Sequence, residues 1–132
     1  MTIRFRRQND GFSLLEILVV IAVLAILAAI AIPQLNLHRF KGFMATVRTD
    51  AKNVHTAVVS WAIDNPGASF PEISEFTGPG ILPNYGVASI SKGVKVSISN
   101  TGDVTATHEG LLGSFKIFFQ GANREDTLSP PY

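Results

Sequence analysis

The sequence predicts an α+β fold, in which a long N-terminal helix packs against a small antiparallel sheet of about three strands. Apolar residues fill the segment 12–33 and recur at helical spacing through 34–64, and three short runs between 92 and 120 alternate apolar and polar residues. Spacings of three and four residues are typical of a helix with one apolar face, whereas strict alternation is typical of a strand. Each alternating run has one apolar face, which the helical stripe can cover.

The segment 12–33 is apolar enough to cross a membrane. Every residue from Ile17 to Ile32 is apolar, and a helix from Phe12 to Ile32 is about 31 Å long at about 1.5 Å per residue, which matches a bilayer core. Glu16 is the charged exception within this segment. Placing an isolated carboxylate at membrane depth costs about 2.5 to 3.5 kcal/mol, so we expect Glu16 to pair with another group and to have a functional role.

Three interpretations of this segment differ in what stays in the protein after export. A secretory signal peptide would use Arg4, Arg6 and Arg7 as its basic region and would be cut after Ala31. A plain single-pass anchor would keep the whole segment. Neither interpretation explains Glu16, because both need only apolar residues there. A permanent helix whose charge later meets a partner does explain it.

The junction between the polar leader and the apolar run has a specific pattern. Residues 11–16 read GFSLLE and lead directly into the apolar stretch. This resembles the class III leader of type IV pilins and type II secretion pseudopilins. In that family a prepilin peptidase cuts after the glycine, here Gly11, so residues 1–11 are removed, and N-methylates the new terminal residue, here Phe12. The resemblance extends from residue 6 to about residue 40 and includes Glu16 and Pro33; past that point it is one of architecture.

The resemblance implies a pilin fold and a structural subunit rather than an enzyme. It implies a homo-oligomeric helical filament, the prepilin peptidase and N-methyltransferase and the inner-membrane assembly machinery as partners, and contact with membrane lipid before assembly. The subunit would first be single-pass in the bacterial inner membrane with a cytoplasmic N-terminus, and then extracellular in the pilus. The implied function is that of a type IV pilin, in attachment, twitching motility or DNA uptake. The alternative is a pseudopilin of a type II secretion system.

Glu16 has two possible partners once the leader is removed. The resemblance implies that it meets the Phe12 amine of the neighbouring subunit during assembly. The alternative is a pair within one chain, since Phe12 and Glu16 are four residues apart and can meet on a helix.

The helical pattern continues past the apolar segment and predicts an amphipathic helix over 34–64. Its end is expected at residues 64–67, Asp-Asn-Pro-Gly, because proline disfavours a helical residue before it and glycine accepts the left-handed conformation. Pro33 predicts a helix kink or local unwinding near residues 29–34. The apolar stripe comprises Phe40, Met44, Val47, Ala51, Val54, Val58 and Trp61.

The rest of the chain is predicted to hold a connecting loop, a sheet and a tail. Proline and glycine recur through 65–91, which indicates a loop with little regular structure. The alternating runs begin at Val94, Val104 and Phe115 and are separated by turn residues, so they predict an antiparallel meander over 92–120. The segment 121–132 is predicted to be an irregular tail.

Few residues indicate chemistry. The chain contains three histidines, which are not at metal-ligand spacings, and no nucleophile or phosphate-loop motif. We therefore expect no enzymatic activity and no cofactor. The net charge is +1 and the basic residues are scattered, so no specific nucleic acid is predicted as a partner.

A calcium site near the C-terminus is a minor alternative. Type II secretion pseudopilins often have one, and Asp103, Glu125 and Asp126 could supply oxygen ligands, but their spacing is not that of a recognisable calcium loop. The prediction is therefore no metal. The chain has no cysteine, so a disulfide cannot hold the tail, and the sequence leaves open what does.

Overall fold

The computed structural model describes residues 11–86, 88–120 and 123–132. The chain divides into two compact units, Met1–Asn36 and Leu37–Tyr132. One helix, α1 (Leu14–Asp64), contributes to both. The leader residues 1–10, with Arg4, Arg6 and Arg7, lie outside the described residues.

In the first unit, α1 presents apolar side chains to its surroundings. Among the described residues, α1 is the one helix that is long and apolar enough to cross a membrane, as judged by length and composition. Its most apolar 18-residue stretch has a mean hydropathy of 3.1, and none of that stretch is buried. These side chains therefore have no packing partner within the described chain, and burying them requires lipid or other helices.

Pro33 lies inside α1, and the residues on both sides of it are helical. No unwound stretch is present at residues 29–34, so the local unwinding expected there is not seen in this structure. The kink at Pro33 stays a prediction.

In the second unit, the helical stripe forms one wall of the core. Val47, Ala51, Val54 and Val58 are completely buried. Trp61 is half-buried at the end of the stripe and packs against the core from its edge.

The end of α1 is where the sequence predicted it. The backbone N–H and the side-chain amide of Asn65 both donate to the carbonyl of Trp61, each at 2.9 Å. Gly67 follows with a φ of 82°, the left-handed conformation that closes helices at little cost in glycine.

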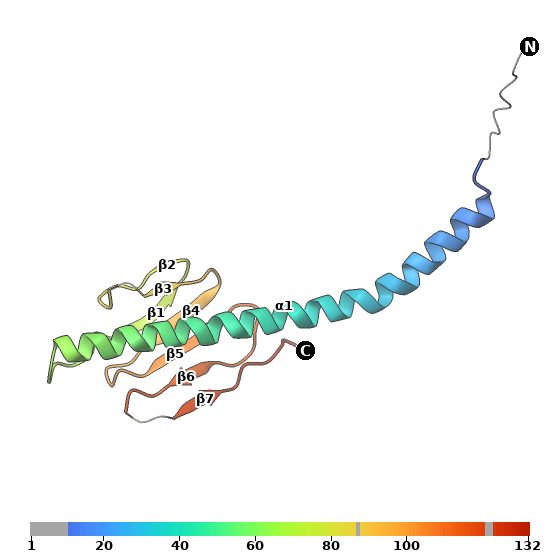
Figure 1. Cartoon of the computed structure of the whole chain (residues 1–132). Coiled ribbons are helices and arrows are strands. Elements are labelled where there is room, and N and C mark those ends of the chain that lie inside the picture. Colours follow the sequence, from blue (N-terminus) through green and yellow to red (C-terminus); the bar gives the residue numbers. More distant parts are fainter. Residues whose placement is uncertain (1–10, 87, 121–122) are drawn as a thin grey trace, which may run out of the picture. The chain divides into compact units, whose positions relative to one another are not determined.

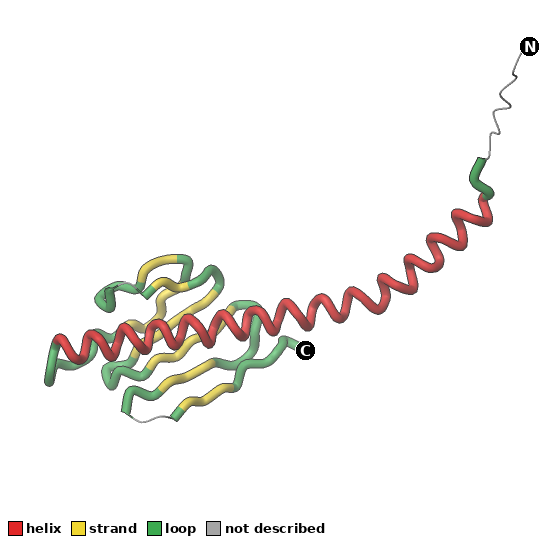
Figure 2. The backbone as a smooth tube through the Cα atoms, in the orientation of Figure 1, coloured by secondary structure: helices red, strands yellow, loops and turns green. Residues whose placement is uncertain are grey.

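The predicted meander is confirmed by three antiparallel strands, β4 (Val94–Ile98), β5 (Val104–His108) and β6 (Phe115–Ile117). Their buried and half-buried residues alternate, because successive side chains of a strand point to opposite faces. Figure 2 shows these strands along one side of residues 37–64 of α1, so the core lies between that helical stretch and the sheet.

The sheet has five strands rather than about three. Its order is β1-β4-β5-β6-β7, with β1 (Ile73–Thr77) and β7 (Arg124–Asp126) at the edges (Figure 1). A separate two-stranded sheet pairs β2 (Gly80–Ile81) with β3 (Ser89–Ile90). The sequence predicted little regular structure over 65–91 and an irregular tail over 121–132, and the strands β1, β2, β3 and β7 correct both predictions. The α+β class is confirmed.

Candidate processing and assembly site

The predicted cleavage junction lies immediately before the helix. Gly11, Phe12 and Ser13 are not helical and are exposed, with 79% of Phe12 accessible. The α1 helix starts at Leu14, and the Ser13 carbonyl accepts hydrogen bonds from the N–H of Glu16 at 3.0 Å and of Ile17 at 3.3 Å. The peptide bond between Gly11 and Phe12 therefore lies outside the helical hydrogen-bond ladder of α1.

Glu16 lies in the first turn of α1 and is exposed. A carboxylate is favourable there because the unpaired N–H groups of the first turn carry partial positive charge. Ser13 precedes it at the three-residue spacing of a capping box. Among the residues that the structure describes, no ion pair or side-chain hydrogen bond involves Glu16. Phe12 is outside the helix, so the four-residue pairing geometry is not formed in the uncleaved chain.

The carboxylates considered for calcium are used in other ways. Asp103 accepts hydrogen bonds from the N–H of Phe119 at 3.0 Å and from the hydroxyl of Thr101 at 3.1 Å. Asp126 pairs with Arg48 on α1 at 2.7 Å. Glu125 is exposed on β7, opposite Lys116. Within the described ranges no group of three potential ligands is close enough to hold a metal ion, so the structure does not bring the three carboxylates together.

The three histidines lie apart and have different surroundings. His38 is exposed. His108 is buried, stacks on Phe43 with ring centroids 4.3 Å apart, and accepts a hydrogen bond at Nδ1 from the N–H of Gly110 at 2.9 Å. Burial lowers the pKa of His55, and the positive charge of Arg124 lowers it further. None of the three histidines belongs to a group of potential metal ligands among the described residues.

Sequence reasoning missed the most deeply buried acidic side chain among the described residues. Asp50 is only 4% exposed, and its carboxylate accepts hydrogen bonds from the N–H of Ser91 at 2.8 Å and from the Ser91 hydroxyl at 3.2 Å. A signal was present, because Asp50 lies three residues after Val47 and four before Val54 on the apolar stripe. The pair ties α1 to the segment between β3 and β4.

With this geometry established, comparison with known families identifies the N-terminal region. Residues 6–32 match the family model of the prokaryotic N-terminal methylation motif. The chain carries a class III prepilin leader. The resemblance noted in the sequence is therefore confirmed over this region, which includes the junction at Gly11 and Phe12, Glu16 and most of the apolar segment.

The motif marks structural proteins of the pilin type and supports a pilin-like or pseudopilin-like protein. It does not distinguish between the two, because both kinds of protein carry it. Comparisons with curated proteins and with solved structures found no significant match.

Proposed function

We propose that this chain is a type IV pilin, a structural subunit without enzymatic activity that polymerises through its N-terminal hydrophobic helix into a pilus filament. The observation that carries the proposal is the methylation motif at residues 6–32, which continues directly into an exposed apolar helix. The filament would serve attachment, twitching motility or DNA uptake.

Processing is the first step. The prepilin peptidase would cut between Gly11 and Phe12 and methylate the new amine of Phe12. The accessible, non-helical backbone of both residues supports this assignment. Before assembly the subunit would cross the inner membrane once, with its N-terminus in the cytoplasm and its apolar side chains in lipid.

Polymerisation would move the apolar helix from lipid into a bundle of identical helices at the filament core. Small residues let helix backbones approach closely, and the exposed segment of α1 has five of them. Assembly would be driven by the inner-membrane pilus machinery, with further copies of this chain as the main partners. The small residues are Ala22, Ala25, Ala28, Ala29 and Ala31.

Glu16 would fix the position of each subunit in the growing filament. Cleavage creates a positive charge on the Phe12 amine, and methylation keeps that charge. In an apolar layer the carboxylate and the amine of a neighbouring subunit offset part of each other's desolvation cost. The lack of a partner for Glu16 among the described residues supports an intermolecular role.

A pseudopilin of a type II secretion system is the second candidate, because the same motif occurs there. Its short filament would push folded proteins outward instead of forming a surface pilus. A strain lacking this chain separates the two candidates. We expect fewer or no surface filaments by electron microscopy and normal secretion; normal filaments with impaired secretion would favour the pseudopilin.

N-terminal sequencing tests the processing step directly. We expect the mature chain to start at N-methyl-Phe12, and Gly11→Val to leave full-length precursor in the membrane. Gly42→Ala, which changes a glycine far from the junction, is the matched control and should be processed normally. A mature start at Ile32 would falsify the pilin proposal and favour a secreted domain.

A further inference from the structure

An open groove of about 610 Å³ is lined by residues of the last turns of α1 and of the segment between β2 and β3. It belongs entirely to the unit Leu37–Tyr132. Its volume is in the range of small-molecule sites. Neither the methylation motif nor the proposed polymerisation helix involves it.

One side of the groove is formed by Trp61, which packs against two other aromatic residues. Trp61 is half-buried and lines the groove, with its ring centroid 5.5 Å from Phe70 and 6.0 Å from Tyr85. Tyr85 is buried, and its hydroxyl donates to the carbonyl of Pro71 at 2.7 Å. The indole of Trp61 therefore packs against Phe70 and Tyr85, and part of it remains accessible from the groove.

A row of short polar side chains lies beside Trp61 on α1. Asn53, Thr56, Ser60 and Asp64 follow at spacings of three and four residues and all line the groove, so they share one helix face. Among the described residues, the side chains of Asn53 and Ser60 make no hydrogen bond. Amide, hydroxyl and carboxylate groups are thus available to a ligand.

The facing wall contains an unusual backbone conformation. Asn84 has a φ of 67° and lines the groove with Ser89. A positive φ is uncommon in residues other than glycine, and asparagine tolerates it best. Glycine would adopt this conformation at least as easily, so the turn alone does not require the amide that Asn84 brings to the groove.

The lining selects the class of ligand. No lysine, arginine or histidine is among the described residues that line the groove, and Asp64 is its one carboxylate, so an anion lacks a counter-charge and a metal ion lacks ligands. A lipid chain would leave the polar side chains unpaired. A neutral sugar offers hydroxyl groups to amides and hydroxyls and an apolar ring face to an indole.

We propose that this groove binds a neutral carbohydrate. The sugar ring stacks on Trp61, and its hydroxyls hydrogen-bond with Asn53, Ser60 and Asn84. The inference is independent of the filament proposal, because the same site would give either a pilin or a pseudopilin affinity for glycans.

Trp61 is the only tryptophan in the chain, so its fluorescence reports on this groove. The full chain in phosphatidylcholine nanodiscs, which contain no sugar headgroup, is titrated with D-galactose, D-glucose and N-acetylglucosamine. We expect at least one of them to change the emission saturably, with a Kd in the millimolar range that is typical of weak small ligands. Absence of a saturable change with all three, or a change with glucuronic acid only, would overturn the proposal.

Two variants locate the site. Asn84→Gly removes the amide and keeps the positive φ, and Ser60→Ala removes a hydroxyl from a helix without disturbing it. Each should weaken binding about five-fold, the loss expected for one hydrogen bond, while Asn100→Ala, in an exposed turn outside the groove, should not. Unchanged affinity in both groove variants contradicts the proposal. So does an emission change that follows protein concentration instead of sugar, because the groove would then be a contact between copies.

Discussion

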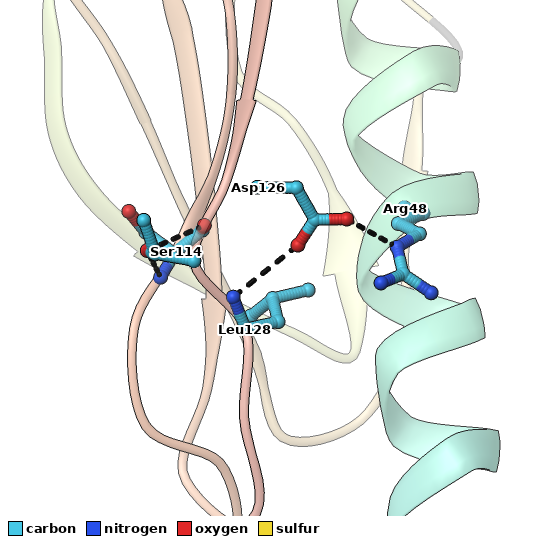
Figure 3. Close-up of polar contacts among 5 residues, drawn as sticks. Arg48, Ser114, Asp126 and Leu128 are labelled. Carbon is cyan, nitrogen blue, oxygen red and sulfur yellow. Dashed lines mark hydrogen bonds and ion pairs between the residues drawn. The ribbon is translucent and has the colours of Figure 1, made fainter.

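The Nε of Arg48 on α1 lies 2.7 Å from Oδ2 of Asp126 on β7, although 78 residues separate them in the sequence (Figure 3). The other oxygen of Asp126 accepts a hydrogen bond from the N–H of Leu128 at 3.2 Å. Beside this pair, three hydrogen bonds join Ser114 and Thr127. The N–H of Ser114 donates to the Thr127 hydroxyl at 3.0 Å, and the hydroxyl and the N–H of Thr127 donate to the Ser114 carbonyl at 3.1 and 3.0 Å. The C-terminal segment of a chain without cysteine is thus attached to both the helix and the sheet.

We expect residues 37–132 to fold without the apolar segment. All the buried side chains of the core lie between Val47 and Ile117, and the unit Leu37–Tyr132 is compact by itself. Removing residues 1–36 should therefore leave a soluble α+β domain with a cooperative unfolding transition, followed by circular dichroism and Trp61 fluorescence. A non-cooperative transition would show that the apolar segment is needed for folding.

Asp126→Asn should weaken the attachment of the tail only slightly. The variant keeps an acceptor for the N–H of Leu128 and loses the charge opposite Arg48, whose side chain is 41% exposed, against 33% for Asp126. Such a partly exposed pair contributes about 0.5 to 1 kcal/mol and is screened by salt. Denaturant unfolding of residues 37–132 at low and high salt measures this. Glu75→Gln, which breaks the more exposed pair with Lys95, is the control and should have a smaller effect.

Gly113→Ala should be strongly destabilising, whereas Gly42→Ala should be stabilising. A Cβ on Gly113 would overlap the carbonyl oxygen of Thr127, and the φ of Gly113 is +78°. Gly42 lies inside α1 with nothing within 4 Å of the added carbon. We expect a loss of about 2 kcal/mol or more at Gly113, and a gain of about 0.5 to 1 kcal/mol at Gly42. Equal effects in denaturant unfolding would contradict this description of the tail.

The stability of the domain should fall as the pH decreases below about 6.5, in part because of His55. Burial and Arg124 lower the pKa of folded His55 from its ordinary value of 6.5. Below about pH 6.5 the unfolded chain therefore binds a proton at His55 more readily than the folded chain does. The free energy of unfolding consequently increases as the pH rises towards 6.5 and decreases on acidification. His55→Gln should flatten the slope between pH 5.5 and 6.5, and Arg124→Gln should flatten it partly. An unchanged slope in His55→Gln would assign the pH dependence to other groups.

The parts of the fold that depend on local pattern were predictable. The end of α1 follows from the proline and glycine after Asp64, which act on the backbone whatever the tertiary context. Strands β4, β5 and β6 follow from alternation, because one face of each is buried against α1.

The two edge strands were not predictable in this way. In β7, Arg124, Glu125 and Asp126 are all exposed, so its strand conformation depends on backbone pairing with β6 and not on an apolar face. In β1 the register shifts between Ile73 and Phe76, and such an irregularity breaks the alternation that marks a strand. Both strands are also adjacent to segments rich in proline or glycine, and such segments predict loops instead of strands.

The same distinction applies to the sites. The processing motif is contiguous in sequence, so six residues and the apolar run after them were enough to predict it. The sugar groove joins α1 to a loop more than 20 residues away, from Ser60 to Asn84, and only the fold brings these residues together. The contact between Asp50 and Ser91 is long-range for the same reason.

Glu16→Leu should separate membrane insertion from assembly. The substitution makes the segment more apolar, so insertion and cleavage after Gly11 should be normal. Breaking a buried charge pair typically costs about 3 to 5 kcal/mol, and a filament repeats that loss at every subunit. We therefore expect Glu16→Leu to give mature protein in the membrane and few or no filaments by electron microscopy, with partial recovery when wild-type subunits are present.

Two further variants distinguish the intermolecular pair from a role within one chain. Glu16→Gln keeps the size and the hydrogen-bonding capacity of the side chain and removes its charge, so it should fail in assembly as Glu16→Leu does. Ser13→Ala removes the hydroxyl that would form a capping box with Glu16. This variant should assemble normally, because the loss of a helix cap costs only about 1 kcal/mol. If Ser13→Ala and Glu16→Leu reduce filament number equally, Glu16 acts as a helix cap. If Glu16→Leu alone forms filaments of normal number and length, the carboxylate has no part in assembly.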